Sequence, residues 1–317
     1  MIDFYSKRKV FFAISILIVI CGVIGLAVNG VQLDIQFQGG TLLQIEMKDN
    51  NYDALKIEDT VKKAIGKSVT VQKMQTFNPK DANSKINMLQ IRVSKDDTLT
   101  SEEVNKVVDL LKKDFAVKEA AQMQVQNVDP FIGKEMLGNA VLAGVLASVL
   151  IVLYVWIRFS SISGLSAAVF ANLALLHDAF VMFAVYTIFK MPLNDSFLAA
   201  VLTILGFSIN DTIVIYDRIR ENTKNMKRTS YAELVNASVT QTLARSINTT
   251  LTVMISIITV YVFASINNIQ SIKDFSFPLI IGLLSGTYST IFIASPLWAL
   301  WQEHKMNKKL AAKASKA

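Results

Sequence analysis

An aspartate inside a long apolar run is the first residue of this sequence that calls for a chemical explanation. Asp211 follows Asn210 in the run 197–216, about five residues, or roughly 7 Å at 1.5 Å per residue, before the run ends. Ionisable groups within lipid are costly and usually face a protein interior or water. Asp211 either decorates a helix end or is a titratable carboxylate in a hydrated region. Its depth and polar neighbours favour the second interpretation.

A polar stripe on the next apolar run, 245–265, offers partners for this carboxylate. At 100° per residue, Thr203 and Asn210 share a helix face with Asp211. Arg245 begins a series of polar residues that recur at three- and four-residue steps as far as Thr259. Serine and threonine often only pack membrane helices together, but packing does not require an arginine. We therefore expect Arg245 and Asp211 to pair, or to take turns with a bound proton, along a polar seam made of Thr203, Asn210, Asn248, Thr249, Thr252 and Ser256.

Two further polar features lie in other apolar runs. His177 and Asp178 are adjacent, so their side chains point about 100° apart on a helix. They are secondary candidates for a proton role, and one of them can instead contact a loop or a partner. In the last run, a face of small residues favours close helix packing over chemistry. That face consists of Gly282, Ser285, Gly286 and Ser289.

Six apolar runs can hold these residues as membrane-spanning helices. About 20 apolar residues suffice to cross a hydrocarbon core of about 30 Å, and the sequence is 52% hydrophobic with only 18% charged residues. The runs are 10–29, 136–157, 163–189, 197–216, 245–265 and 277–301. We interpret the first as a retained anchor, because it is longer than the apolar part of a signal peptide and 27–29 is a poor cleavage site.

The basic residues of the short connections predict the orientation of these helices, because cytoplasmic loops are rich in lysine and arginine. The opposite short loops carry only Lys190 and Lys273, each near an aspartate. Both termini and the loop 217–244 are therefore predicted to be cytoplasmic. The basic residues that support this are Lys7, Arg8, Lys9, Arg158, Arg218, Arg220, Lys224, Lys227, Arg228, Lys305, Lys308, Lys309, Lys313 and Lys316.

The long segment between the first two runs predicts a small extracytoplasmic α/β domain at 30–135. Alternation and β-branched content predict strands at 31–37 and 41–47, separated by the turn residues Gly39 and Gly40. A helix is expected at 53–65, and strands at 69–77 and 86–93 around a polar loop, 78–85. Thr100 and Glu103 predict a capping box that opens a helix to about 115, and 122–128 completes the set as a strand. This order is ferredoxin-like.

The predicted molecule is thus an α-helical integral membrane protein with six transmembrane helices and a small ferredoxin-like domain. We divide it into an N-terminus with the first helix (1–29), the extracytoplasmic domain (30–135), the bundle of helices two to six (136–301) and a basic cytoplasmic tail (302–317).

Several classes of function are disfavoured by the composition. Cys21 is the single cysteine, and His177 and His304 are the two histidines, so neither a disulfide nor a metal centre is expected. The net charge of +7 lies largely beside apolar runs, which points to membrane orientation and away from nucleic acid. The sequence lacks a Gly-x-x-x-x-Gly-Lys-Ser/Thr phosphate loop. We expect no cofactor and no enzymatic activity.

Four segments resemble the SecF family of protein translocase subunits, in the resistance–nodulation–division superfamily. They are 37–41, with Gly39 and Gly40; 176–178, with His177 and Asp178; the long and specific stretch 206–222; and 241–246. The resemblance covers nearly the whole chain. The residue before the two glycines is Gln38, where many relatives carry threonine or lysine.

The resemblance implies a role that spacing alone does not show. It implies an accessory subunit of the Sec machinery in the bacterial cell membrane that uses an H⁺ or Na⁺ gradient to drive late-stage translocation of unfolded polypeptides. The implied partners are a separate SecD-like subunit, the SecYEG channel and the translocating chain, within membrane lipid. By motif, Asp211 matches the family's ion-coupling aspartate and Arg245 its essential arginine.

Two other functions remain as alternatives at this point. Half of a small-molecule exporter of the same superfamily would use a similar acidic helix, although such exporters normally have about twelve spans in one chain. A passive scaffold would explain the small-residue faces but not Asp211 and Arg245.

Overall fold

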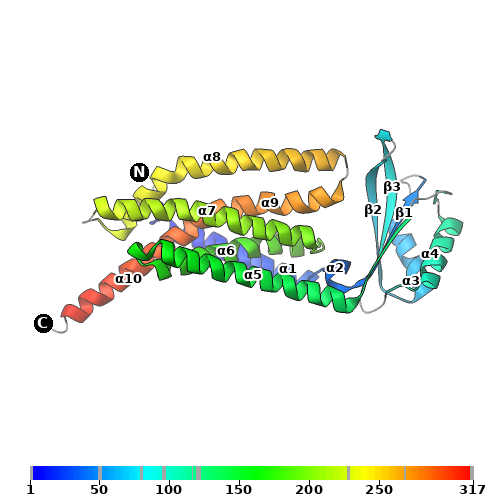
Figure 1. Ribbon diagram of the computed structural model, residues 1–317, viewed down its shortest axis with the longest axis horizontal. Coiled ribbons are helices and arrows are strands. Elements are labelled where there is room, and N and C mark those ends of the chain that lie inside the picture. Colours follow the sequence, from blue (N-terminus) through cyan, green and yellow to red (C-terminus); the bar gives the residue numbers. More distant parts are fainter. Residues whose placement is uncertain are drawn as a thin grey trace.

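The computed structural model describes residues 3–48, 52–78, 81–94, 98–115, 117–118, 123–226, 229–267 and 269–314. Figure 1 shows an elongated molecule with a helical bundle at one end and a small sheet domain at the other. Both termini and the connection between α7 and α8 lie at the end of the bundle that is farthest from the sheet.

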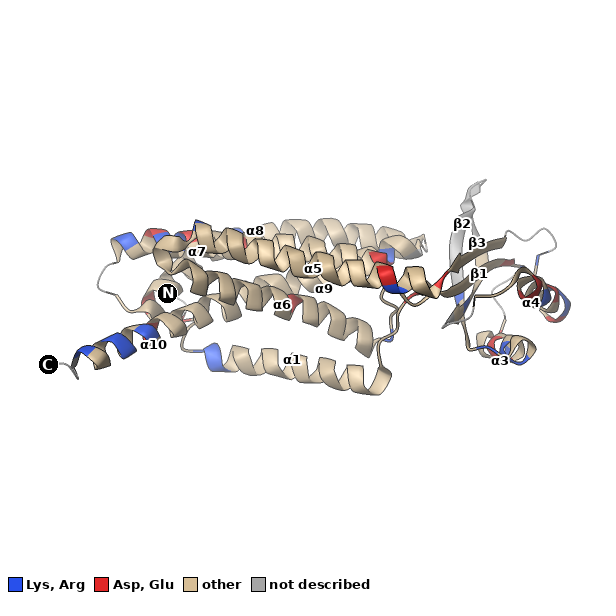
Figure 2. Ribbon diagram, turned by 60° about the horizontal axis from the view of Figure 1, so that its bottom comes forward, with Lys and Arg blue, Asp and Glu red and all other residues tan. Residues whose placement is uncertain are grey.

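Within the described residues, six helices are long and apolar enough to cross a membrane, which agrees with the predicted number of spans. Five of them are α1 (Arg8–Asn29), α5 (Pro130–Arg158), α6 (Gly164–Ile188), α7 (Asp195–Asn225) and α8 (Tyr231–Ile266). The sixth is formed by α9 (Gln270–Ser289), the π-helical turn η2 (Thr290–Ala294) and α10 (Ser295–Ala314), and a short 3₁₀ helix, η1 (Ser160–Ile162), links α5 to α6. In Figure 2, the ribbon segments of charged residues gather at the ends of the bundle and on the sheet domain, while the ribbon between is almost uniformly that of uncharged residues.

The predicted loop 217–244 is wrong as a loop, because most of it is helical. Helix α7 continues to Asn225, and a capping box formed by Ser230 and Glu233 opens α8 at Tyr231. The apolar runs that identified these two spans end at 216 and begin at 245, but the helices continue beyond them with partly buried residues. Their buried residues, including Ile219 and Val235, share a core cluster with Trp298. Residues 227 and 228, which contributed to the predicted orientation, lie outside the described residues, as does 316.

The last span is irregular at two prolines. Pro278 lies inside α9, where it leaves the carbonyl of Asp274 without its helical donor; the Tyr186 hydroxyl donates to that carbonyl at 3.0 Å. Pro296, which also lacks an N–H, follows the π-helical turn, and Ser295 donates its hydroxyl to the Thr290 carbonyl at 3.0 Å. The π-helical turn begins at Thr290, immediately after Ser289.

The sheet domain has the predicted ferredoxin-like order. Strands β1 (Gly40–Met47), β2 (Val69–Asn78), β3 (Asp81–Ser94) and β4 (Met123–Val128) form an antiparallel sheet in the order β2-β3-β1-β4. Helices α3 (Ala54–Ile65) and α4 (Ser101–Asp114) connect the strands, and both lie on the same face of the sheet (Figure 1). The capping box of Thr100 and Glu103 is present at the start of α4, as predicted.

Two predicted features of this domain are wrong. Residues 31–37 do not form a strand: Leu33 makes an isolated bridge to Leu193, and α2 (Ile35–Gln38) follows at once. The alternating apolar residues serve another purpose, because Ile35 and Phe37 are buried and Phe37 contacts the first turns of α5 at Gly133. The polar loop 78–85 is shorter than predicted, since β2 reaches Asn78 and β3 begins at Asp81. Strand pairing needs only backbone groups, so polar composition did not reveal it.

The two predicted turn glycines join the sheet domain to the bundle. Gly39 has φ of 79°, a left-handed conformation that favours glycine. A Cβ on Gly39 would lie 2.5 Å from the Cα of Pro130, the first residue of α5. Gly40 opens β1. This close approach lets β1 leave the membrane surface beside the start of α5.

Candidate functional site

Asp211 lies in α7 and is buried, with 8% of its surface exposed. One carboxylate oxygen, Oδ1, accepts a hydrogen bond of 2.5 Å from the Ser246 hydroxyl on α8. The other oxygen, Oδ2, is buried without a hydrogen-bond partner in the described structure. Buried polar atoms are rarely left unpaired, and each exception calls for an explanation. The carboxylate is therefore half satisfied, and its free oxygen can take a proton, a cation or a donor from another chain.

Arg245 does not pair with Asp211 in this conformation. The two residues form no ion pair within 4.0 Å, although the charge of Arg245 still acts on the carboxylate through space. Arg245 is exposed on α8, whereas the next residue, Ser246, is buried and reaches Asp211. One residue turns the helix by about 100°, so Ser246 faces Asp211 while Arg245 points away from it into the neighbouring pocket.

The polar seam is exposed and does not line the interior of the bundle. The face of α8 that packs inward instead carries Thr242, Ser246 and Thr250, and Thr250 shares a 2.8 Å hydrogen bond with Thr287 of α9. The predicted polar face of α8 is thus rotated by about one residue, or about 100°, from the face that is buried. Small polar residues at four-residue spacing marked both faces equally, so the sequence held no signal to choose between them. The exposed seam residues are Thr203, Asn210, Asn248, Thr249, Thr252 and Ser256.

The seam residues differ in whether their side chains find hydrogen-bond partners. The hydroxyls of Thr203, Thr252 and Ser256 donate to carbonyls four residues earlier in their own helices, at 2.7 to 3.1 Å. Asn210 and Asn248 make no side-chain hydrogen bond within the part of the chain that the structure describes. A hydroxyl that donates to a carbonyl of its own helix is tolerated next to lipid. A side-chain amide with unpaired donors and acceptors is costly there. The seam is suited to contact with another polar surface.

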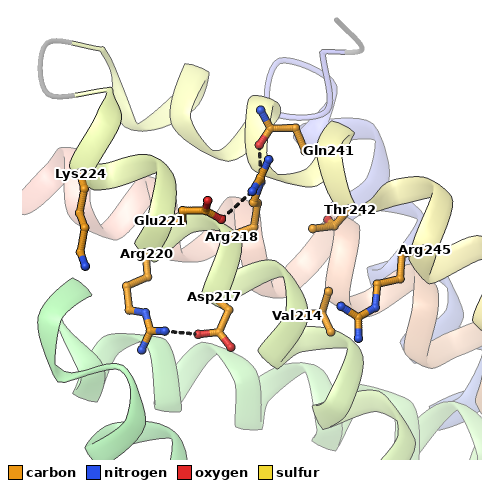
Figure 3. A pocket seen from close by; sticks show the side chains of 9 residues that line it. All are labelled: Val214, Asp217, Arg218, Arg220, Glu221, Lys224, Gln241, Thr242 and Arg245. Atoms are coloured by element: carbon orange, nitrogen blue, oxygen red, sulfur yellow. Dashed lines mark hydrogen bonds and ion pairs between the residues drawn. The ribbon is translucent and has the colours of Figure 1, made fainter.

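A pocket of about 570 Å³ opens between α7 and α8 beside Arg245, at the end of the bundle away from the sheet (Figures 1 and 3). Arg218 donates to Glu221 and to Gln241, and Arg220 pairs with Asp217 at 2.9 Å. Val214, which is one turn beyond Asp211 on α7, forms part of the wall. The pocket therefore reaches within one helical turn of the buried carboxylate along α7. Its lining residues are Val214, Asp217, Arg218, Arg220, Glu221, Lys224, Gln241, Thr242 and Arg245.

Asp178 occupies a different environment, in the centre of the bundle. It is completely buried, and its carboxylate accepts hydrogen bonds from Ser208 of α7 at 2.7 Å and from Ser285 and Ser289 of α9 at 2.6 and 2.8 Å. His177 Nδ1 lies 3.3 Å from Asp178 Oδ1. The small-residue face of α9 was predicted only to pack closely. Its two serines also donate to Asp178, which the sequence could not show because the partner lies about 110 residues earlier.

The described residues bring together no group of three or more histidine, cysteine or acidic side chains that could hold a metal ion. Cys21 is exposed on α1.

Comparison with known proteins places the chain among export proteins. The family model described as "Protein export membrane protein SecD/SecF, C-terminal" matches residues 107–304. The chain is 37% identical to the protein translocase subunit SecF of Alicyclobacillus acidocaldarius, covering 96% of this chain and 94% of that relative. It is 34% identical to the protein translocase subunit SecDF of Bacillus subtilis, where 98% of this chain matches only 39% of the longer protein. The crystal structure of SecDF from Thermus thermophilus, a translocon-associated membrane protein, superposes with a TM-score of 0.79 at 27% identity, over 95% of this chain and 39% of that one.

Proposed function

Because the chain belongs to the SecD/SecF family of protein-export membrane proteins, we propose that it couples the movement of an ion through Asp211 to a late stage of polypeptide export. The observation that carries this proposal is the half-satisfied carboxylate of Asp211. It is buried within a membrane span, has one oxygen without a partner in the described structure, and lies one helical turn from Val214, which lines a pocket together with Arg245. An ionisable residue within a membrane span is costly, so a carboxylate in such a position indicates a functional site.

Exchange of a proton at Asp211 can do mechanical work. Protonation removes a buried charge, which is worth about 1.4 kcal/mol for each pKa unit by which two conformations differ. An elementary charge that crosses the membrane potential supplies about 2.3 kcal/mol per 100 mV. A gradient can therefore drive the exchange of two conformations if they bind the ion with different affinity.

The arrangement of α8 suggests what those two conformations are. In the structure, Ser246 holds Asp211 while Arg245 stands in the neighbouring pocket. A rotation or shift of α8 would exchange the neutral serine donor for the positive arginine, which favours an ionised carboxylate. Arg245 and the bound ion would then alternate at Asp211.

A SecD-like subunit is the proposed partner at the polar seam. Asn210, Asn248 and Arg245 are exposed where a bundle in lipid would hold apolar side chains. The relatives named SecDF are single longer chains, and this chain spans about two fifths of the Bacillus relative and of the Thermus structure. A second bundle against α7 and α8 would cover the seam and bring further donors to Asp211 Oδ2.

We extend the proposal to the four-part organisation and to the orientation of the molecule. The segment 1–29 would be the cytoplasmic N-terminus with the first helix, 30–135 the extracytoplasmic domain, 136–301 the bundle and 302–317 the cytoplasmic tail, in the bacterial cell membrane. Both termini and the α7–α8 connection share one end of the bundle (Figure 1), which supports a common side for them. The sheet domain would then act on unfolded polypeptide leaving the SecYEG channel, without enzymatic chemistry.

The decisive test is export into inverted membrane vesicles that contain the wild-type chain or Asp211→Asn. The variant is expected to assemble normally and to lose the gradient-dependent stage, because an amide cannot exchange an ion. Collapsing the proton and sodium gradients separately identifies the ion. A matched control is Asp195→Asn, an exposed aspartate in the first turn of the same helix, which should export normally. Gradient-dependent export by Asp211→Asn would sink the proposal.

The small-molecule exporter is not favoured, since the curated relatives are named as protein translocase subunits. Co-purification of the chain with a SecD-like protein and channel subunits would separate the two functions further.

A further inference from the structure

The carboxylate of Asp178 is held by hydrogen-bond donors from three directions and has no strong positive charge beside it. Ser208, Ser285 and Ser289 donate to it from α7 and α9, and His177 Nδ1 lies against Oδ1. In the described residues, no lysine or arginine forms an ion pair with Asp178. A full negative charge in the centre of a membrane bundle is costly without a cation. His177 is the single neighbour that can supply a compensating proton.

His177 itself is arranged as half of a proton-sharing pair. Its side chain is 9% exposed, and Nε2 is buried without a hydrogen-bond partner in the described structure. A proton on Nε2 would lack an acceptor, so Nδ1 carries the proton of the neutral ring and donates it to Asp178. The imidazole also lies against Tyr288, with ring centroids 6.2 Å apart.

The other groups around the pair are neutral or remote. Tyr288 is the titratable group that α9 presents, and its hydroxyl donates to the Phe11 carbonyl of α1 at 2.6 Å and contacts Ser15. On α7, the nearest acidic residue along the chain is Asp211, three residues after Ser208. Ser246 satisfies one of its oxygens from the opposite side.

One of the three serines has an alternative acceptor. The Ser289 hydroxyl lies 2.8 Å from Asp178 Oδ2 and 3.2 Å from the Gly286 carbonyl in its own helix. If a proton from water binds Oδ2, the new O–H donates to Ser289 Oγ, and the serine O–H turns to Gly286. Every donor keeps an acceptor in both states, and one proton is gained. The π-helical turn η2 begins at the next residue, and such turns often mark functional sites within helices.

We propose that His177 and Asp178 form a second proton-binding site, distinct from Asp211, whose occupancy sets how α9 is held against α6 and α7. With the proton absent, three serine hydroxyls converge on one carboxylate and tie the three helices together. With the proton bound, the Ser289 hydroxyl returns to its own helix and the tie loosens next to η2. This site stands on its own geometry and does not depend on the role of Asp211.

The two histidines of the chain make a direct test feasible. His304 is exposed on α10, so a His304→Gln chain labelled with ¹⁵N-histidine shows one imidazole by NMR. In the full-length chain in lipid nanodiscs, we expect the ¹⁵N signal of His177 Nδ1 to change as the pH is lowered, because a proton bound at Asp178 Oδ2 weakens the acceptor of the Nδ1–H. Asp178→Asn should lose this change. A signal that does not change with pH in the wild type, or that changes equally in Asp178→Asn, would overturn the proposal and leave Asp178 as a static hydrogen-bonded tie.

Infrared difference spectra between high and low pH provide the second measurement. The wild-type chain should show the carbonyl stretch of a buried protonated carboxyl that is missing in Asp178→Asn and kept in Asp211→Asn. If Asp178→Asn does not fold, Ser289→Ala keeps the titratable pair and should shift the frequency of that band. If the band that Asp211→Asn keeps is also present in Asp178→Asn, or is unmoved by Ser289→Ala, that result contradicts the site. The Asp211→Asn arm separates this outcome from a failure of ion coupling at Asp211.

Discussion

The two buried aspartates of the bundle show how similar residues in one membrane can differ in purpose. Asp178 lies at the centre of α6, α7 and α9, with every carboxylate lone pair directed at a donor. Asp211 lies on the outer side of the bundle, where one oxygen meets Ser246 and the other meets no donor. The first environment holds helices together and the second is incomplete. An incomplete site is one that an ion or a partner chain can complete.

The largest contrast is expected in stability. Asp178→Ala leaves three serine hydroxyls facing a cavity and should lower the free energy of unfolding by at least about 2 kcal/mol. Asp211→Ala removes one serine bond and should cost about 1 kcal/mol or less. Thermal unfolding of both variants in the same detergent measures the difference. Equal losses would remove the distinction between the two carboxylates.

Substitution of Arg245 tests the proposed activity at Asp211 without affecting stability. Arg245→Lys keeps the charge but loses the planar guanidinium, which binds a carboxylate through two parallel bonds. We expect gradient-dependent export to fall strongly while the unfolding temperature stays unchanged, since the side chain is exposed. Lys224→Arg, which alters another cation in the same pocket, serves as the control. Full export by Arg245→Lys would show that charge alone suffices.

Ser246 should have a smaller effect on export than Asp211. Ser246→Ala removes the 2.5 Å bond to Asp211 and should lower stability by about 1 kcal/mol. It should also reduce export partially, because the resting partner of the carboxylate is lost while Arg245 remains. Ser246→Thr keeps the hydroxyl and should restore both readouts. Wild-type export by Ser246→Ala would mean that this bond takes no part in the cycle.

The smallest effect is expected for a carboxylate in water, at Glu103 of the sheet domain. Its hydrogen bond from the Lys67 ammonium, at 2.8 Å, lowers the pKa of Glu103 below its ordinary value of 4.5, helped by the Thr100 backbone N–H. A group whose pKa is lowered on folding stabilises the fold above its unfolded pKa and loses that contribution as the pH falls through the folded value. Glu103→Gln should therefore be slightly less stable than the wild type at neutral pH.

The same difference should fade as the pH falls below 4.5, the ordinary value for the group. The neighbouring exposed Glu102→Gln is the control and should show less pH dependence. Unfolding curves at several pH values measure both variants. A Glu103→Gln deficit that persists unchanged in acid would show that the capping geometry, and not the charge, sets the contribution.

Much of the architecture could be predicted because lipid imposes a simple rule. Apolar length alone identified six spans, and alternation with capping residues identified the ferredoxin-like order of the sheet domain. The errors occurred where that rule does not apply. Residues 31–37 alternate like a strand, yet Ile35 and Phe37 are buried through α2 against the start of α5. The helices of 217–244 lie beyond the apolar runs and were therefore missed.

By itself, the sequence determined which ionisable side chains lie within the apolar runs: two aspartates, one histidine and one arginine. Only the tertiary structure decided which groups meet. Each residue turns a helix by 100°, so a rotation of one step replaces Arg245 with Ser246 as the neighbour of Asp211. That rotation is set by packing between distant segments, as where a Cβ on Gly282 would lie 2.5 Å from Ile204 of α7. Periodicity along one helix shows its faces but not its rotation against a neighbour.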